Sequence, residues 1–154
     1  MATIGAKLPP QILRERIVQR LKPGAVIKLN ARMNDGNVKE KRYVVLSVTA
    51  KTVCCVVNSE KNAFVQARPT LARHHVPMDA SSHVFMDHDS FVDCTQTKTF
   101  ETSQVVSDLM ERTEWMLGAI SLELRDRIVT SLTTSSTIAP NLTQPLCNEL
   151  AKLS

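Results

Sequence analysis

Hydrophobic residues recur at two different spacings along the chain, and the change between them divides the sequence into three parts. Residues 11–21 carry apolar positions at helical spacing, follow a proline pair and end at Lys22-Pro23-Gly24, so they are predicted to form a helix. Its apolar members are Ile12, Leu13, Ile17, Val18 and Leu21. Residues 25–94 carry short apolar runs bounded by polar stretches, a pattern typical of strands. Beyond Phe100 the helical spacing returns.

The central part is predicted to be a small all-β unit. The expected strands are residues 25–29, 42–48, 53–57, 74–78 and 90–94. Residues 49–52 read as a tight turn that joins the second and third of these strands into a hairpin. The polar stretches 30–41 and 58–73 are expected to be loops, and a loop as long as the second is usually functional or partly ordered.

Two or three helices are expected after the β unit. Thr102 or Ser103 can cap a helix that runs to about residue 112, and Ser121 can cap the next one. A last helix is expected within residues 141–153. The predicted fold is therefore α+β with a mainly β core. Its parts are an N-terminal helical segment (1–22), a β unit (23–100) and C-terminal helices (101–154) that form one structural unit with it.

Composition narrows the class of protein. Apolar residues make up 43% and charged residues 22% of the chain, which are ordinary values for a globular domain. No apolar run approaches the roughly 20 residues that cross a bilayer, and residues 1–7 lack the apolar core of a signal peptide, so we expect a cytoplasmic protein without a membrane partner. Aromatic residues make up only 4%, which argues against a stacking platform for several bases.

The four cysteines are expected to be buried free thiols. Cys54, Cys55, Cys94 and Cys147 contain no C-x-x-C spacing, and adjacent residues on a strand point to opposite faces. This argues against both a disulfide framework and a cysteine-based zinc site.

The charge is distributed unevenly. Residues 1–52 carry eleven Lys or Arg and three acids, a net of +8, whereas the rest of the chain carries −4 of the total of +4. The basic half favours a polyanion or an acidic partner protein, and a solvated surface is the alternative. The candidate residues for contacting a polyanion such as RNA are Lys28, Arg32, Lys39, Lys41, Lys61 and Arg68.

Acidic and imidazole groups gather just before the strand at residues 90–94. His88 could act as a base or an acid if Asp87 or Asp89 orients it, and a solvated polar loop is the alternative. Six residues in this part of the chain carry atoms that can bind a metal ion: His74, His75, His83, Asp87, His88 and Asp89. Their spacing matches no dedicated metal site, so neither a metal nor another cofactor is expected.

Four short segments resemble the PemK/MazF-like toxins of type II toxin–antitoxin systems, in the order found in that family. They are Lys41-Arg42-Tyr43-Val44-Val45-Leu46-Ser47, Val56-Val57-Asn58-Ser59, Asp89-Ser90-Phe91-Val92-Asp93-Cys94 and Leu117-Gly118-Ala119-Ile120-Ser121. The third is the most specific, being similar to an Asp-Ser-Tyr-Val-Asp-Cys segment of some PemK-like proteins. The resemblance implies a small SH3-like barrel and metal-independent cleavage of single-stranded RNA. It also implies a homodimer and neutralisation by an antitoxin protein.

The resemblance also suggests catalytic residues. Arg42 aligns with the strand-entry arginine of the family, which stabilises phosphate charge or donates a proton, and Ser59 aligns with a Thr or Ser at the end of a strand. His88 and Asp89 are possible neighbours. The chain departs from the family where Tyr43 replaces proline and Asn58 stands where threonine is common. Two alternatives are a non-catalytic barrel that binds nucleic acid or a partner protein, and an interaction module that docks a partner through its terminal helices.

Overall fold

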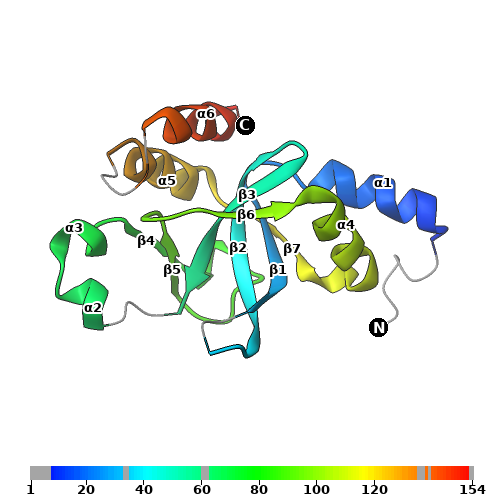
Figure 1. Ribbon diagram of the computed structural model, residues 1–154, viewed down its shortest axis with the longest axis horizontal. Helices are drawn as coiled ribbons and strands as arrows, with labels where there is room; N and C mark the ends of the chain where they lie inside the picture. Colours follow the sequence, from blue (N-terminus) through cyan, green and yellow to red (C-terminus); the bar gives the residue numbers. More distant parts are fainter. Residues whose placement is uncertain (1–7, 33–34, 60–62, 135–137, 139, 153–154) are drawn as a thin grey trace.

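The computed structural model describes residues 8–32, 35–59, 63–134, 138 and 140–152. The chain has an α+β fold built on a curled antiparallel sheet (Figure 1). The strands are β1 (Ala25–Arg32), β2 (Val38–Val48), β3 (Lys51–Asn58), β4 (His75–Met78), β5 (Ser90–Asp93), β6 (Lys98–Glu101) and β7 (Met116–Ala119). The helices are α1 (Pro10–Arg20), α2 (Ala63–Gln66), α3 (Pro69–Ala72), α4 (Thr102–Glu111), α5 (Leu122–Thr134) and α6 (Pro140–Ala151). The sheet order is β4-β5-β3-β2-β1-β7, and β6 pairs with β3.

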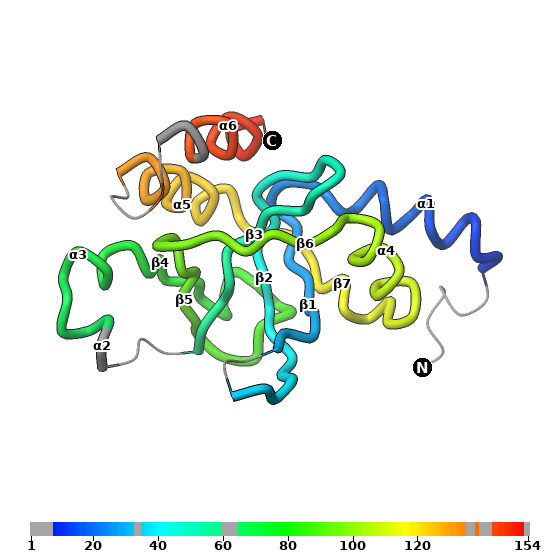
Figure 2. Tube along the Cα trace, viewed as in Figure 1, coloured from blue at the N-terminus to red at the C-terminus, as the bar shows by residue number. Residues whose placement is uncertain are grey.

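The sheet is packed on both faces. Val44 and Cys55 lie opposite each other on β2 and β3 and belong to the core cluster that also contains residues of α5 and α6. Tyr43 and Val56 are the next pair and point to the opposite face, into a cluster with residues of α1 and α4. The same separation is visible in the chain trace, where α5 and α6 lie apart from α1 and α4 (Figure 2). Period-two alternation along valine-rich strands therefore gives two cores.

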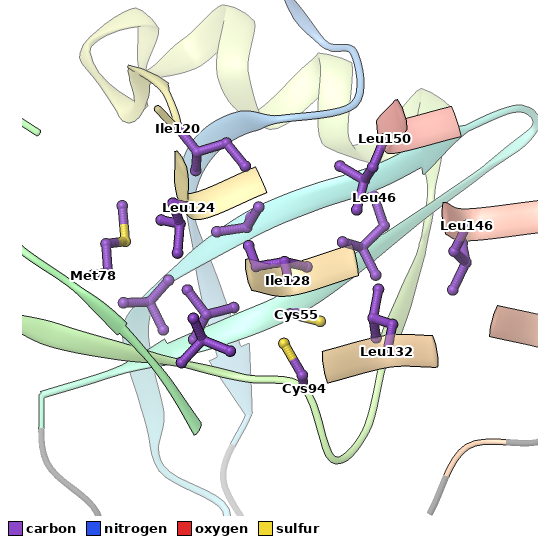
Figure 3. Close-up of a cluster of buried hydrophobic side chains, with 14 of the residues drawn as sticks. Leu46, Cys55, Met78, Cys94, Ile120, Leu124, Ile128, Leu132, Leu146 and Leu150 are labelled. Carbon is purple, nitrogen blue, oxygen red and sulfur yellow. The ribbon is translucent and has the colours of Figure 1, made fainter. Parts of the chain in front are cut away.

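The first cluster joins buried side chains of the strands to apolar side chains of α5 and α6 that lie over the sheet (Figure 3). Ile128, Leu132 and Leu150 are fully buried, and each such burial stabilises the fold by about 1.5–3 kcal/mol. The start of α5 is fixed by Ser121, whose Oγ accepts a hydrogen bond from the Leu124 amide at 3.1 Å. The predicted role of Ser121 as an N-cap is confirmed.

The cysteines are free and buried, as expected. Burial raises the pKa of Cys54 to about 12. A side-chain hydrogen bond with Cys94, together with burial, raises the pKa of Cys55 well above its ordinary value, and Figure 3 shows the two residues side by side. Because the thiolate is the reactive form, these residues act as small apolar side chains.

The prediction of a loop at residues 30–41 was wrong. β1 extends to Arg32 and β2 begins at Val38, with Leu29 opposite Lys41 and Arg32 opposite Val38, so the two strands form a long hairpin. Near its tip, Asp35 accepts a hydrogen bond from the Asn37 amide at 2.9 Å, and Gly36 has φ of +87°. The sequence did not predict these parts of the strands, because this end of the hairpin is largely exposed and its side chains show no alternation of apolar and polar residues.

Other boundaries also differ from expectation. The expected loop at residues 58–73 contains the short helices α2 and α3, and β6 and β7 were missed altogether. α4 is not capped by Thr102 or Ser103 as predicted, since Glu101 precedes it and makes no side-chain cap. The Thr102 hydroxyl instead donates to the Thr49 carbonyl at 2.7 Å, which ties α4 to the β2–β3 turn.

α1 is held by one side only. Ile17 and Leu21 are buried in the second cluster, whereas Ile12 and Val18 are exposed.

Among the described residues, no helix combines the length and the apolar character needed to span a membrane.

Gly118 on β7 is predicted to tolerate no side chain. A Cβ built at this position would lie 2.6 Å from the Phe85 ring, so we expect Gly118→Ala to lower the free energy of unfolding by about 1–3 kcal/mol. Urea denaturation measures this loss. In a Phe85→Ala background the same substitution should cost little, because the ring that it meets is gone. Equal costs in both backgrounds would contradict the packing described.

Candidate nucleic-acid interface

A cleft of about 290 Å³ opens at the ends of β2, β3 and β5. It brings together six of the residues singled out from the sequence. The described lining consists of Lys28, Lys39, Glu40, Lys41, Arg42, Val57, Ser59, His88 and Ser90. The residues come from separate stretches of the chain, so the sheet assembles the cleft.

The strand register explains why Arg42 stands in this cleft. Arg42 lies opposite Lys28 on β1 and opposite Val57 on β3. It shares a sheet face with Val44, two residues away, which is buried in the first core cluster. The face therefore changes from apolar to cationic between Val44 and Arg42, and Ser59 continues the line of Val57 beyond the end of β3.

Cations dominate the charge of the cleft. Lys28, Lys39, Lys41 and Arg42 line it, against the single carboxylate of Glu40 in the described lining. The Lys28 Nζ lies 3.6 Å from Glu40 Oε2 and 5.9 Å from the centroid of the Trp115 ring, so both β2 and the η3 turn (Thr113–Trp115) position it. Such a surface attracts a polyanion.

The Arg42 guanidinium is only partly engaged by protein groups. Its Nη1 lies 3.5 Å from Asp87 Oδ1, and the Arg42 side chain is 25% exposed. Within the described residues its Nε has no hydrogen-bond partner. The exposed part of the guanidinium can therefore take up a phosphate, for which its planar fork of donors is suited.

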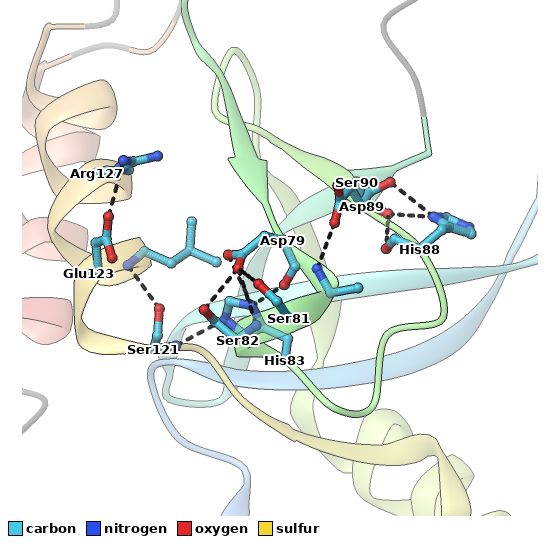
Figure 4. A network of polar contacts seen from close by, with 12 residues as sticks. Asp79, Ser81, Ser82, His83, His88, Asp89, Ser90, Ser121, Glu123 and Arg127 are labelled. Carbon is cyan, nitrogen blue, oxygen red and sulfur yellow. Dashed lines mark hydrogen bonds and ion pairs between the residues drawn. The ribbon is translucent and has the colours of Figure 1, made fainter.

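His88 is oriented by two contacts of its Nδ1 atom (Figure 4). Its Nδ1 lies 3.0 Å from the Asp89 backbone carbonyl and 3.1 Å from Ser90 Oγ. Because a carbonyl oxygen can only accept, Nδ1 carries a hydrogen. The other nitrogen, Nε2, lies 3.8 Å from Asp87 Oδ1. This geometry directs Nε2, the nitrogen that is free to exchange a proton, toward the acidic group beside Arg42.

Asp89 does not line the cleft. Its carboxylate accepts a hydrogen bond from the Ala80 amide at 2.9 Å, at the start of the η2 turn (Ala80–Ser82). Asp79 holds the same turn, and hydrogen bonds from Ser81 and Ser82 lower the pKa of Asp79 to about 2. The loop that carries His88 is thereby fixed at its base, with Asp89 in a supporting position (Figure 4). Asp87 is the aspartate that lies beside the imidazole.

The remaining predicted RNA contacts lie elsewhere. Arg32 is exposed at the end of β1, and Arg68 directly precedes α3; neither lines the cleft. Lys61 lies outside the described residues. Sequence reasoning did not select Glu40 or Ser90. Glu40 lies two residues before Arg42, and this spacing puts both side chains on one face of a strand. The sequence pattern predicts a loop at residues 30–41, and a loop does not reveal this relation.

The histidines considered as metal ligands serve separate structural roles. The Nδ1 of His74 contacts Ser131 Oγ at 2.7 Å and that of His75 contacts the Leu71 carbonyl at 2.9 Å. His83 contacts the Asp79 carbonyl through Nδ1 and accepts the Ser121 amide hydrogen through Nε2. In the part of the chain that the structure describes, no three His, Cys, Asp or Glu side chains gather as a metal site would require.

His74 provides a pH-dependent contribution to stability. Burial, followed by the charges of Arg73 and His75, lowers the pKa of His74 from its ordinary value of 6.5. The unfolded chain therefore binds this proton more readily, so the contribution is complete above pH 6.5 and is lost as the pH falls through the lower pKa of the folded state. We expect His74→Gln to weaken the fall in unfolding free energy between about pH 7.5 and about pH 5.5, measured by urea denaturation. An unchanged pH dependence would exclude His74 as its source.

No protein-family model matches the chain, and no curated protein matches its sequence.

Proposed function

We propose that this protein is a PemK/MazF-like endoribonuclease, with an SH3-like barrel, that cleaves single-stranded RNA at the Arg42 cleft without a metal ion. The observation that carries the proposal is the placement of Arg42 in one cleft with an imidazole, His88, and a carboxylate, Glu40. Cleavage of RNA by its own 2′-hydroxyl needs a base, an acid and a cation at the phosphorus, and these three residues can supply them.

The proposed reaction assigns one role to each group. Glu40 accepts the proton of the 2′-hydroxyl, and the 2′-oxygen forms a bond to phosphorus. The bond from phosphorus to the 5′-oxygen breaks, and the imidazolium of His88 donates its Nε2 proton to that oxygen. Arg42 stabilises the negative charge on the pentacoordinate phosphorus, and Ser59 can donate a hydrogen bond to a phosphate oxygen. The products are a 2′,3′-cyclic phosphate and a 5′-hydroxyl.

The lining also supports a preference for the backbone of the RNA over its bases. Apart from His88, no aromatic side chain is among the described lining residues, whereas four cations are. Binding should then come mainly from phosphate contacts and fall steeply with added salt. A single strand suits the site, because its backbone can place the 2′-hydroxyl in line with the leaving oxygen.

The test compares RNA and DNA of one sequence. Purified protein is incubated in EDTA with single-stranded RNA, the RNA duplex and single-stranded DNA, and the products are separated on a denaturing gel. The proposal expects cleavage of single-stranded RNA and intact DNA, since DNA lacks the 2′-hydroxyl. Cleavage of DNA at the same rate would refute the mechanism.

A non-catalytic barrel that binds nucleic acid is the second candidate, and the excess of cations in the cleft supports it equally. It predicts salt-sensitive binding of RNA and of DNA without products. A homodimer and an acidic antitoxin remain parts of the proposal. Sedimentation of the chain alone, and with any small acidic protein encoded beside it, tests both.

A further inference from the structure

Asp87 stands between the two central groups of the cleft. One of its oxygens, Oδ1, lies 3.5 Å from Arg42 Nη1 and 3.8 Å from His88 Nε2. The Asp87 side chain is 73% exposed. A single carboxylate oxygen is thus shared between a guanidinium and an imidazole, and it makes a full hydrogen bond to neither, because both distances exceed hydrogen-bond range.

Asp87 is paired with the Arg42 guanidinium, the group that would otherwise bind an RNA phosphate. An exposed ion pair at this distance is weak. A phosphate can offer two oxygens to the guanidinium and is attracted as well by Lys28, Lys39 and Lys41. RNA should therefore displace Asp87 from Arg42, at a cost to affinity.

The displaced carboxylate has one nearby cation left to pair with. His88 Nδ1 already donates to the Asp89 carbonyl. A second proton, on Nε2, makes the ring an imidazolium, and this proton would face Asp87. The charged residues that line the cleft together with His88 are Lys28, Lys39, Lys41 and Arg42, all cations, and Glu40. Asp87 is consequently the carboxylate closest at hand to stabilise the charged ring.

We propose that Asp87 is a positioning residue that moves from Arg42 to His88 when an RNA phosphate enters the cleft. This inference rests on the proposed function. In the empty cleft Asp87 neutralises Arg42 and so weakens RNA binding. In the complex it stabilises the imidazolium, which has taken its proton from solvent and later gives it to the 5′-oxygen. Substrate binding thus prepares the acid for the step that follows.

The inference predicts opposite effects of Asp87→Asn on the two kinetic constants. KM should fall about twofold to fivefold, because the competitor of the phosphate loses its charge. The turnover number should fall about tenfold to a hundredfold at pH 8 and by less at pH 5.5, because acid solution favours the same charged ring that Asp87 is proposed to stabilise. A loss of structure would raise KM or lower activity equally at every pH, so it could not produce this split.

Two variants control the experiment. Asp126→Asn removes the charge of an exposed aspartate in another Arg–Asp pair, Arg125–Asp126, and should leave both constants unchanged. Asp87→Glu keeps the charge and should restore part of the turnover. The dissociation constant for the same RNA with a 2′-deoxy cleavage site gives the affinity separately, and it should be lower for Asp87→Asn than for the wild type.

The outcomes separate this inference from the proposed function. If the wild type cleaves RNA but Asp87→Asn leaves KM and turnover unchanged, or raises KM, the positioning role is overturned and the nuclease stands. If the wild type cleaves no RNA, the proposed function fails and the positioning role fails with it. A lower KM together with a turnover deficit that shrinks at low pH supports both.

Discussion

Arg42→Ala should reduce the rate of RNA cleavage by about 10²–10³-fold, the usual effect of removing one group that stabilises charge in a transition state. The backbone of Arg42 is held on both sides, because β2 pairs at this residue with Lys28 of β1 and with Val57 of β3. Its loss should also weaken binding of uncleavable RNA, but by less, because the three lysines remain. Single-turnover cleavage and binding to RNA with a 2′-deoxy cleavage site measure the two effects.

Two variants separate the role of Arg42 from general charge. Arg42→Lys keeps the charge but loses the planar fork, so it should recover only part of the rate. Arg14→Ala removes an exposed arginine from α1, outside the cleft, and should cleave as the wild type does. If Arg42→Ala cleaved at the rate of Arg14→Ala, the cleft would not be the site of the reaction.

His88→Ala should lower the cleavage rate by about 10²–10⁴-fold, the range expected for the loss of a general acid. The defect should be specific to the leaving group. An RNA with sulfur in place of the 5′-oxygen at the cleavage site has a leaving group that needs no proton, so His88→Ala should cleave it nearly as fast as the wild type does. Glu40→Gln should stay slow on both substrates, because the 2′-hydroxyl still needs a base. Equal defects of His88→Ala on the two substrates would remove His88 from the role of acid.

The sequence was most informative where local chemistry decides the structure. Ser121 caps α5 because a serine hydroxyl before an apolar helical pattern satisfies a free amide in any context. The valine-rich strands β2 and β3 were recognised because both of their faces are buried. The outer part of the β1–β2 hairpin was not, since its residues face solvent and only the ladder of backbone hydrogen bonds defines it. β7 was missed because pairing with β1, far away in sequence, creates it.

The sequence predicted some members of the candidate site but not their arrangement. Arg42, Ser59 and His88 were singled out from a resemblance and from residue type, and they do line one cleft. The Asp89 carboxylate accepts a hydrogen bond from the Ala80 amide, nine residues away, so Asp87 is the aspartate beside His88. Sequence spacing does not reveal that contact. The register that brings Lys28 opposite Arg42 likewise comes from pairing between strands.

The curled antiparallel sheet is consistent with a small barrel, which agrees with the expected fold at a coarse level. Helices cover the apolar part of both sheet faces, and the cleft lies where this cover ends. α5 and α6 cover the apolar part, marked by Val44 and Cys55, and the cleft begins where cations replace these residues. The proposed chemistry therefore lies at the border of the first core cluster.

Identifying the RNA ends that the wild-type protein produces in EDTA tests the proposed cleavage most directly. We expect a 2′,3′-cyclic phosphate on one fragment and a 5′-hydroxyl on the other, and neither with Arg42→Ala. Fragments that end in a 5′-phosphate, or the absence of any product while RNA is bound, would contradict the proposed cleavage.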